Sequence, residues 1–79
     1  MARVLLFGPL RDLAGWRERD VAGESLAVIR ALLMAEDPQL GEALGGPGVQ
    51  VAVDQAIVRG DVSLSAGSEV AFLPPMSGG

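Results

Sequence analysis

The stretch EVAFLPPMSGG, residues 69–79, contains a strand-like apolar run that ends abruptly at two prolines. The apolar and aromatic residues from Glu69 to Leu73 are typical of a buried strand. A second run of this kind, RVLLF from Arg3 to Phe7, lies near the other end of the chain, and we interpret it as a strand buried on both faces. Because these two runs are the most apolar, we expect them to lie side by side in the middle of one sheet.

One main helix is predicted between these strands, from Leu26 to about Glu36. Ser25 can cap its first turn, and Pro38 stops it because the residue before a proline disfavours helical geometry. Four residues at helical spacing predict one buried stripe: Leu26, Ile29, Leu32 and Leu33. A second short helical piece is predicted in QLGEAL, residues 39–44, followed by a loop at GGPG, residues 45–48.

Three further strands complete the predicted sheet. WRERDV, residues 16–21, is expected to be an edge strand paired with the first strand, and VQVAVDQAIV, residues 49–58, a hairpin that turns at Asp54-Gln55. One helix cannot cover two faces of a sheet, so we predict an α+β fold with a mixed sheet of four or five strands packed on one main helix. With a right-handed crossover between the parallel central strands, this is a β-grasp roll. We expect a single domain over residues 1–79, with 74–79 as an extended tail.

The composition excludes several classes of function. The 79 residues include no cysteine, histidine, lysine or tyrosine, and the net charge is −4. No thiolate or imidazole is therefore available as nucleophile, general base or metal ligand, and we expect no bound cofactor or metal. An acidic chain is also a poor binder of nucleic acid. The N-terminal apolar run is too short for a signal peptide or a membrane span, so we expect a cytoplasmic protein without a membrane partner.

The tail, residues 74–79, is suited to presenting its carboxylate to another protein. Its two prolines stiffen it and aim it away from the sheet, and its six residues reach roughly 20 Å when extended. Gly78 and Gly79 lack β-carbons, so the walls of a partner can close on their backbone. The last ionisable side chain is that of Glu69. We therefore interpret Gly79 as the true chain end with a reactive carboxylate; the alternative is a frayed terminus of small residues.

Three stretches resemble the small, sulfur-carrying subunit of molybdopterin synthase, a family of ubiquitin-like sulfur carriers of the MoaD/ThiS type. They are the tail EVAFLPPMSGG, the opening VLLFGPLRDLAG at residues 4–15, and the hairpin VAVDQAIV at residues 51–58, where Asp54 stands in place of the usual Asn. The resemblance spans most of the chain and is weakest from Trp16 to Gly48. It implies a ubiquitin-like β-grasp fold and a sulfur carrier in molybdenum cofactor biosynthesis that is not an enzyme on its own.

The resemblance also implies a mechanism in which Gly79 carries the reacting atom. An E1-like adenylating enzyme uses ATP to convert the Gly79 carboxylate into an acyl-adenylate. A persulfide of a sulfur donor protein then delivers sulfur, which leaves a thiocarboxylate at Gly79. The large subunit of molybdopterin synthase, in an expected heterotetramer, transfers this sulfur to a cyclic pterin. The alternative is a ubiquitin-like modifier joined to lysines of other proteins, or a sulfur carrier for thiamine or tRNA thiolation. Without lysine, the chain cannot form side-chain-linked polymers of itself.

The candidate partner-binding residues lie near the end of the last strand. Strand alternation turns Val70 and Phe72 to the core and Leu73 outward, at the root of the tail, and Ile57 could join Leu73 from the adjacent hairpin. Arg11 either pins the tail, meets a partner or is simply solvated. The predicted partner-binding set is Leu73, Ile57, Pro74, Pro75, Met76, Ser77 and Arg11, with Gly78 and Gly79 as the reacting end.

Overall fold

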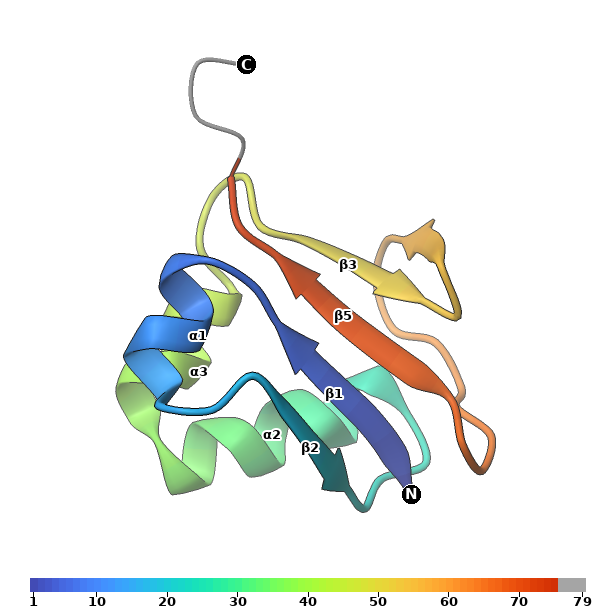
Figure 1. Ribbon diagram of the computed structural model, residues 1–79. Coiled ribbons are helices and arrows are strands. Elements are labelled where there is room, and N and C mark those ends of the chain that lie inside the picture. Colours follow the sequence, from blue (N-terminus) through green and yellow to red (C-terminus); the bar gives the residue numbers. More distant parts are fainter. Residues whose placement is uncertain (76–79) are drawn as a thin grey trace.

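Five strands form one mixed sheet in the order β2-β1-β5-β3-β4, in a computed structural model that describes residues 1–75 (Figure 1). β1 and β5 are parallel, and the other neighbouring strands are antiparallel. Along the chain, the elements are β1 (Ala2–Leu6), α1 (Pro9–Ala14), β2 (Glu18–Val21), α2 (Leu26–Glu36), α3 (Pro38–Leu44), β3 (Gln50–Val53), β4 (Ala56–Val58) and β5 (Glu69–Leu73).

The last strand occupies the centre of the sheet, as predicted. β1 pairs with β5, and the last pair in this register places Leu6 opposite Phe72. On the other side of β5, β3 pairs with it from Gln50 opposite Leu73. β5 therefore has a hydrogen-bonded neighbour along both edges, and this pairing continues to the point where the tail begins.

The core lies between the sheet and the helices, on one face of the sheet. In Figure 1, α2 passes behind β1, and the near face of the sheet is uncovered. Phe72 of β5 and Ile29 of α2 are both 0% exposed, and burying a side chain of this size contributes about 1.5–3 kcal/mol. The rest of the core cluster consists of Ala2, Val4, Leu6, Leu10, Val21, Leu26, Leu33, Leu40, Leu44, Val51 and Val70.

Two expectations about burial are wrong. Leu32 is 40% exposed and does not belong to the buried stripe of α2. Successive helical residues are about 100° apart, so Leu32 points well away from its neighbour Leu33, which is buried. The first strand is buried on one face only: Leu5 is half-buried and Phe7 is 44% exposed, because no helix in the described part of the chain covers the outer face of the sheet.

Side-chain caps hold the starts of the two longer helices. Ser25 Oγ accepts a hydrogen bond from the Val28 amide at 3.3 Å, as its position in the sequence predicts. Asp61 Oδ1 accepts from the Ala27 amide at 2.8 Å, which joins the loop between β4 and β5 to the same helix end. Asp37 caps α3, the short helical piece that was expected in this region. A cap of this kind contributes about 0.5–2 kcal/mol.

The β3–β4 hairpin turns at Asp54-Gln55, as predicted. The φ angles of these two residues are 50° and 72°, the positive values that a two-residue type I′ turn requires. Asp54 Oδ1 also accepts a hydrogen bond from the Glu69 amide at 2.9 Å, and the Asp54 amide donates to the Glu69 carbonyl at 2.8 Å. Asp54 therefore joins the hairpin turn to the start of β5.

Candidate functional site

The uncovered face of the sheet carries an apolar row that crosses four strands. The pairing register aligns Leu5, Ala71, Ala52 and Ile57 on β1, β5, β3 and β4. The two alanines are each 9% exposed, whereas Ile57 at the edge is 52% exposed. A face of this kind, with small residues in the middle and larger apolar ones at its borders, can receive a partner with little charge to desolvate, since Glu18, which pairs in register with Leu5, lies beyond the edge of the row. We define the docking face as Leu5, Phe7, Ala52, Ile57, Ala71 and Leu73.

The docking face contains both Leu73 and Ile57, which the sequence singled out. Leu73 lies outside the core cluster as a half-buried residue. It does not adjoin Ile57, because β3 separates their strands. Neighbouring strands are about 4.8 Å apart, so β4 lies about 10 Å from β5. Ala71 and Ala52 bridge this distance. Strand alternation alone turns Ala71 outward together with Leu73, as expected from the sequence. The sequence interpretation missed Ala52, which strand alternation combined with the hairpin register could have found.

Two arginines border the docking face. Arg11 and Arg17 line a shallow cavity of about 250 Å³ together with Leu5 and Phe7. The Arg11 side chain is half exposed, and its Nε lies 3.8 Å from Asp12 Oδ1. This places Arg11 beside the docking face as a largely solvated residue. Arg17 has the same placement and was missed, because the sequence marks it only as part of an edge strand.

The opposite end of the outer face is charged. Arg3 pairs in register with Glu69, and its Nε lies 3.3 Å from Glu18 Oε2. Both members of this ion pair are about half exposed, so it contributes only about 0–1 kcal/mol. The outer face is therefore charged near the start of β5 and apolar near its end, where the tail begins.

The tail leaves the sheet between two loops. Figure 1 shows the end of β5 with the β1–α1 connection on one side and the α3–β3 loop on the other. Gly8 in the first connection lies against Pro74, and Gly48 in the second lies against Pro75. The predicted site residues Met76, Ser77, Gly78 and Gly79 lie outside the described residues.

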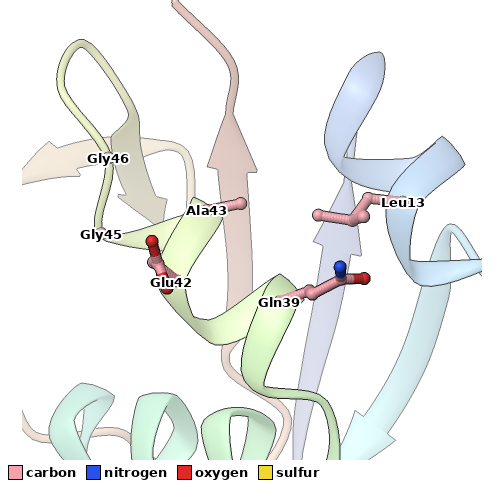
Figure 2. A pocket seen from close by; sticks show the side chains of 6 residues that line it. All are labelled: Leu13, Gln39, Glu42, Ala43, Gly45 and Gly46. Carbon is pink, nitrogen blue, oxygen red and sulfur yellow. The ribbon is translucent and has the colours of Figure 1, made fainter.

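A cavity of about 700 Å³ lies between α1 and α3 and does not have the chemistry of a catalytic site. Figure 2 shows Leu13 of α1 facing Gln39 and Ala43 of α3 across it. Glu42 is the one titratable residue in its lining, so the cavity holds no acid–base pair. Within residues 1–75, no group of three or more His, Cys, Asp or Glu could hold a metal ion. Nor is any helix of this part long and apolar enough for a membrane crossing.

Residues 4–79 match the ThiS family. The chain is 35% identical over 81 residues to the molybdopterin synthase sulfur carrier subunit of Escherichia coli (strain K12), and the match covers 100% of both chains.

Two solved structures share the fold, the ubiquitin-like β-grasp that the sequence predicted. The crystal structure of SAMP1, a small archaeal modifier protein from Haloferax volcanii, is similar with a TM-score of 0.78 and 26% identity, covering 99% of this chain and 98% of that one. The complex of subunits 1 and 2 of molybdopterin-converting factor from Helicobacter pylori contains a chain similar at a TM-score of 0.74 and 22% identity, with coverage of 99% and 97%. The sequence match over nearly the whole chain and the full-length relative show that the chain belongs to the ThiS family.

Proposed function

We propose that the chain is a sulfur carrier in molybdenum cofactor biosynthesis, the small, non-catalytic subunit of a molybdopterin synthase. The observation that carries this proposal is the similarity to the Escherichia coli sulfur carrier subunit, which covers the whole chain, Gly78 and Gly79 included. The fold supports it, because the strand before the tail is central and is paired along both edges. The composition supports it too, since a carrier needs no catalytic side chains of its own.

In this proposal, the Gly79 carboxylate is the reacting group. One of its oxygens attacks the α-phosphorus of ATP, pyrophosphate leaves, and an acyl-adenylate forms. A persulfide of the donor protein then attacks the acyl carbon and displaces AMP, and a thiol cleaves the sulfur–sulfur bond, leaving the thiocarboxylate. The large subunit finally passes this sulfur to the cyclic pterin. The activating enzyme and the large subunit supply the bases and the phosphate-binding groups, because this chain has no histidine, lysine or cysteine.

The docking face is the surface that we propose for the large subunit. Ile57 and Phe7 are its most exposed members and would bury apolar area on contact. Arg11 and Arg17 stand at its border, where they could pair with acidic groups of the partner. The tail begins directly after Leu73, so a partner bound to this face is placed to receive residues 74–79.

Deletion of Gly79 tests the proposed function. The full chain, incubated with the activating enzyme of its own genome, ATP and sulfide, is expected to exchange one oxygen for sulfur in its intact mass. The shortened chain should gain neither AMP nor sulfur, because productive attack needs reacting atoms about 3–3.5 Å apart. Its melting temperature should equal that of the full chain, which controls for folding. Sulfur gain by the shortened chain at the full rate would contradict the proposal.

A second candidate, a ubiquitin-like modifier, is favoured by the similarity to SAMP1. The two candidates differ in the acceptor. A modifier forms an amide between Gly79 and a lysine of another protein, whereas a carrier transfers sulfur and regains its carboxylate. Mass spectrometry of tryptic peptides from the host would detect lysines that carry residues 60–79, because the last tryptic site follows Arg59. Conversion of the pterin by the purified large subunit and the charged chain would support the sulfur carrier.

A further inference from the structure

Two glycines from separate loops touch the two prolines at the root of the tail. A β-carbon placed on Gly48 would lie 2.9 Å from Pro75 Cβ and 3.3 Å from Pro75 Cγ. A β-carbon placed on Gly8 would lie 3.3 Å from Pro74 Cγ. All three separations are shorter than ordinary van der Waals contact, which begins at 3.4 Å. The prolines therefore occupy space that any other residue type at positions 8 and 48 would fill.

Backbone conformation alone does not explain these contacts. Gly48 has a φ of +81°, which favours glycine whatever its surroundings. Gly67 has the same φ of +81°, yet a β-carbon there would meet nothing within 4 Å. Gly15 and Gly60 also combine a positive φ with open space. Among the positive-φ glycines within residues 1–75, the two that lie against other parts of the chain, Gly8 and Gly48, both contact the root of the tail.

The two loops that carry these glycines are joined to the sheet on opposite sides of β5. Gly8 directly precedes α1 and follows β1, and its carbonyl accepts a hydrogen bond from the Asp12 amide at 3.2 Å. Gly48 leads into β3, and it lies within a turn that is closed by a hydrogen bond from the Val49 amide to the Gly46 carbonyl at 3.3 Å. Because β1 and β3 both pair with β5, the two glycines are held in position relative to the strand that ends at the prolines.

We propose that Gly8 and Gly48 are positioning residues that form a notch for Pro74 and Pro75 and thereby set the direction in which the C-terminal segment leaves the sheet. This inference rests on the proposed function, because direction matters only if the carboxylate must reach a partner's active site. Relief of the contact at Gly48, from 2.9 Å to the ordinary 3.4–4 Å, requires Pro75 to move by about 0.5–1 Å. One residue is about 3.5 Å long, so a displacement of this size at Pro75 changes the direction of the chain. At the end of a four-residue extended segment, the change in direction would amount to a shift of about 2–4 Å.

The test compares Gly48→Ala with Gly67→Ala, a matched control. Both substitutions place a β-carbon at the same positive φ of 81°, which disfavours a side chain, but only the first meets the tail. We expect similar losses in melting temperature. In ATP–pyrophosphate exchange with the activating enzyme of the same genome, Gly48→Ala should lower kcat about 10- to 100-fold with little change in KM, since displacement of reacting groups by about 1 Å can cost about 100-fold. Gly67→Ala should retain the kcat of the unsubstituted chain. Equal kcat values for the two variants would overturn the inference.

A rescue experiment distinguishes a specific contact between Gly48 and Pro75 from general damage to the fold. The double variant Gly48→Ala/Pro75→Gly removes both proline atoms that the new β-carbon would meet most closely. In the Pro75→Gly background, Gly48→Ala should therefore lower kcat no further, so the double variant should have the kcat of Pro75→Gly alone. A further loss of about 10- to 100-fold in the double variant would count against the notch.

A second measurement uses only the unsubstituted chain, so it requires neither a folded variant nor an enzyme. In the unsubstituted chain, nuclear Overhauser effects between the Gly48 Hα protons and the Pro75 ring protons are expected, and their absence would overturn the inference. If the unsubstituted chain forms no adenylate while these effects are present, the proposed function fails and the contact stands.

Discussion

Replacement of Ile57 by alanine should weaken binding to the large subunit by about fivefold. Ile57 is 52% exposed, so roughly half of its side chain is already buried in the free chain. Complete burial of such a side chain is worth about 1.5–3 kcal/mol, so the half that remains for a partner to cover is worth about 1 kcal/mol. At about 1.4 kcal/mol for each tenfold change in affinity, this corresponds to about fivefold. Ile57→Asp should cost more, because a carboxylate would then be desolvated in an apolar contact.

The control for this prediction is Leu32→Ala. Leu32 has a similar exposure of 40% but lies on α2, which covers the opposite face of the sheet. The two substitutions therefore remove comparable apolar area from different faces. Isothermal titration calorimetry with the purified large subunit should show weaker binding for Ile57→Ala and unchanged binding for Leu32→Ala. Equal affinities for the two variants, or a larger loss for Leu32→Ala, would refute the assignment of the docking face.

Two further predictions concern stability and can be read from urea unfolding. Ile29→Ala should lower the free energy of unfolding by about 2–5 kcal/mol, because Ile29 is fully buried, and a loss no larger than that of Leu32→Ala would mean that the core is misplaced. Asp54→Ala should cost about 1–3 kcal/mol, since it removes the acceptor for the Glu69 amide and places alanine at a φ of 50°. Asp54→Asn keeps an acceptor and tolerates a positive φ, so it should stay close to the unsubstituted chain; equal losses for the two variants would show that the hydrogen bond is worth nothing.

The elements that could be predicted from the sequence are those with strong signals at both ends. Ser25 and Pro38 bracket α2, and Pro74 stops β5, so the predicted and observed bounds of these two elements agree. The exposure of Phe7 could not be predicted in this way, because it depends on which face of the sheet the helices cover. The exposure of Leu32 follows instead from helical geometry, since Leu32 is about 100° from its buried neighbour around the axis of α2. Local sequence periodicity shows how apolar residues are spaced along one element, but not whether another element of the fold covers them.

The contacts at the root of the tail could not be predicted from local sequence patterns, for a different reason. Gly48 belongs to GGPG, which has the composition of an ordinary surface loop, and nothing near it in the sequence indicates a contact with Pro75. The two residues meet only because β3 and β5 pair and bring the start of one strand beside the end of the other, with Gln50 opposite Leu73. Likewise, the row of Ala52 and Ala71 exists only once the register of β3 against β5 is known.

The docking face and the exit of the tail share β5, and in the proposed function this shared strand would couple binding of the partner to delivery of the tail. Ala71 lies in the middle of the docking face, and Pro74 follows three residues later, a distance of about 10 Å along an extended chain. β5 is paired with β1 and β3 on its two edges, so this spacing does not depend on a loop that can change length or direction. A partner that binds the outer face is thereby placed at a fixed distance from the first residue of the tail. On an edge strand, one row of backbone groups would be unpaired, and the strand could separate from its neighbour when the tail is drawn into a partner. Under the proposed function, the central position of β5 explains how a chain that supplies no catalytic side chains can determine where its C-terminal carboxylate is delivered.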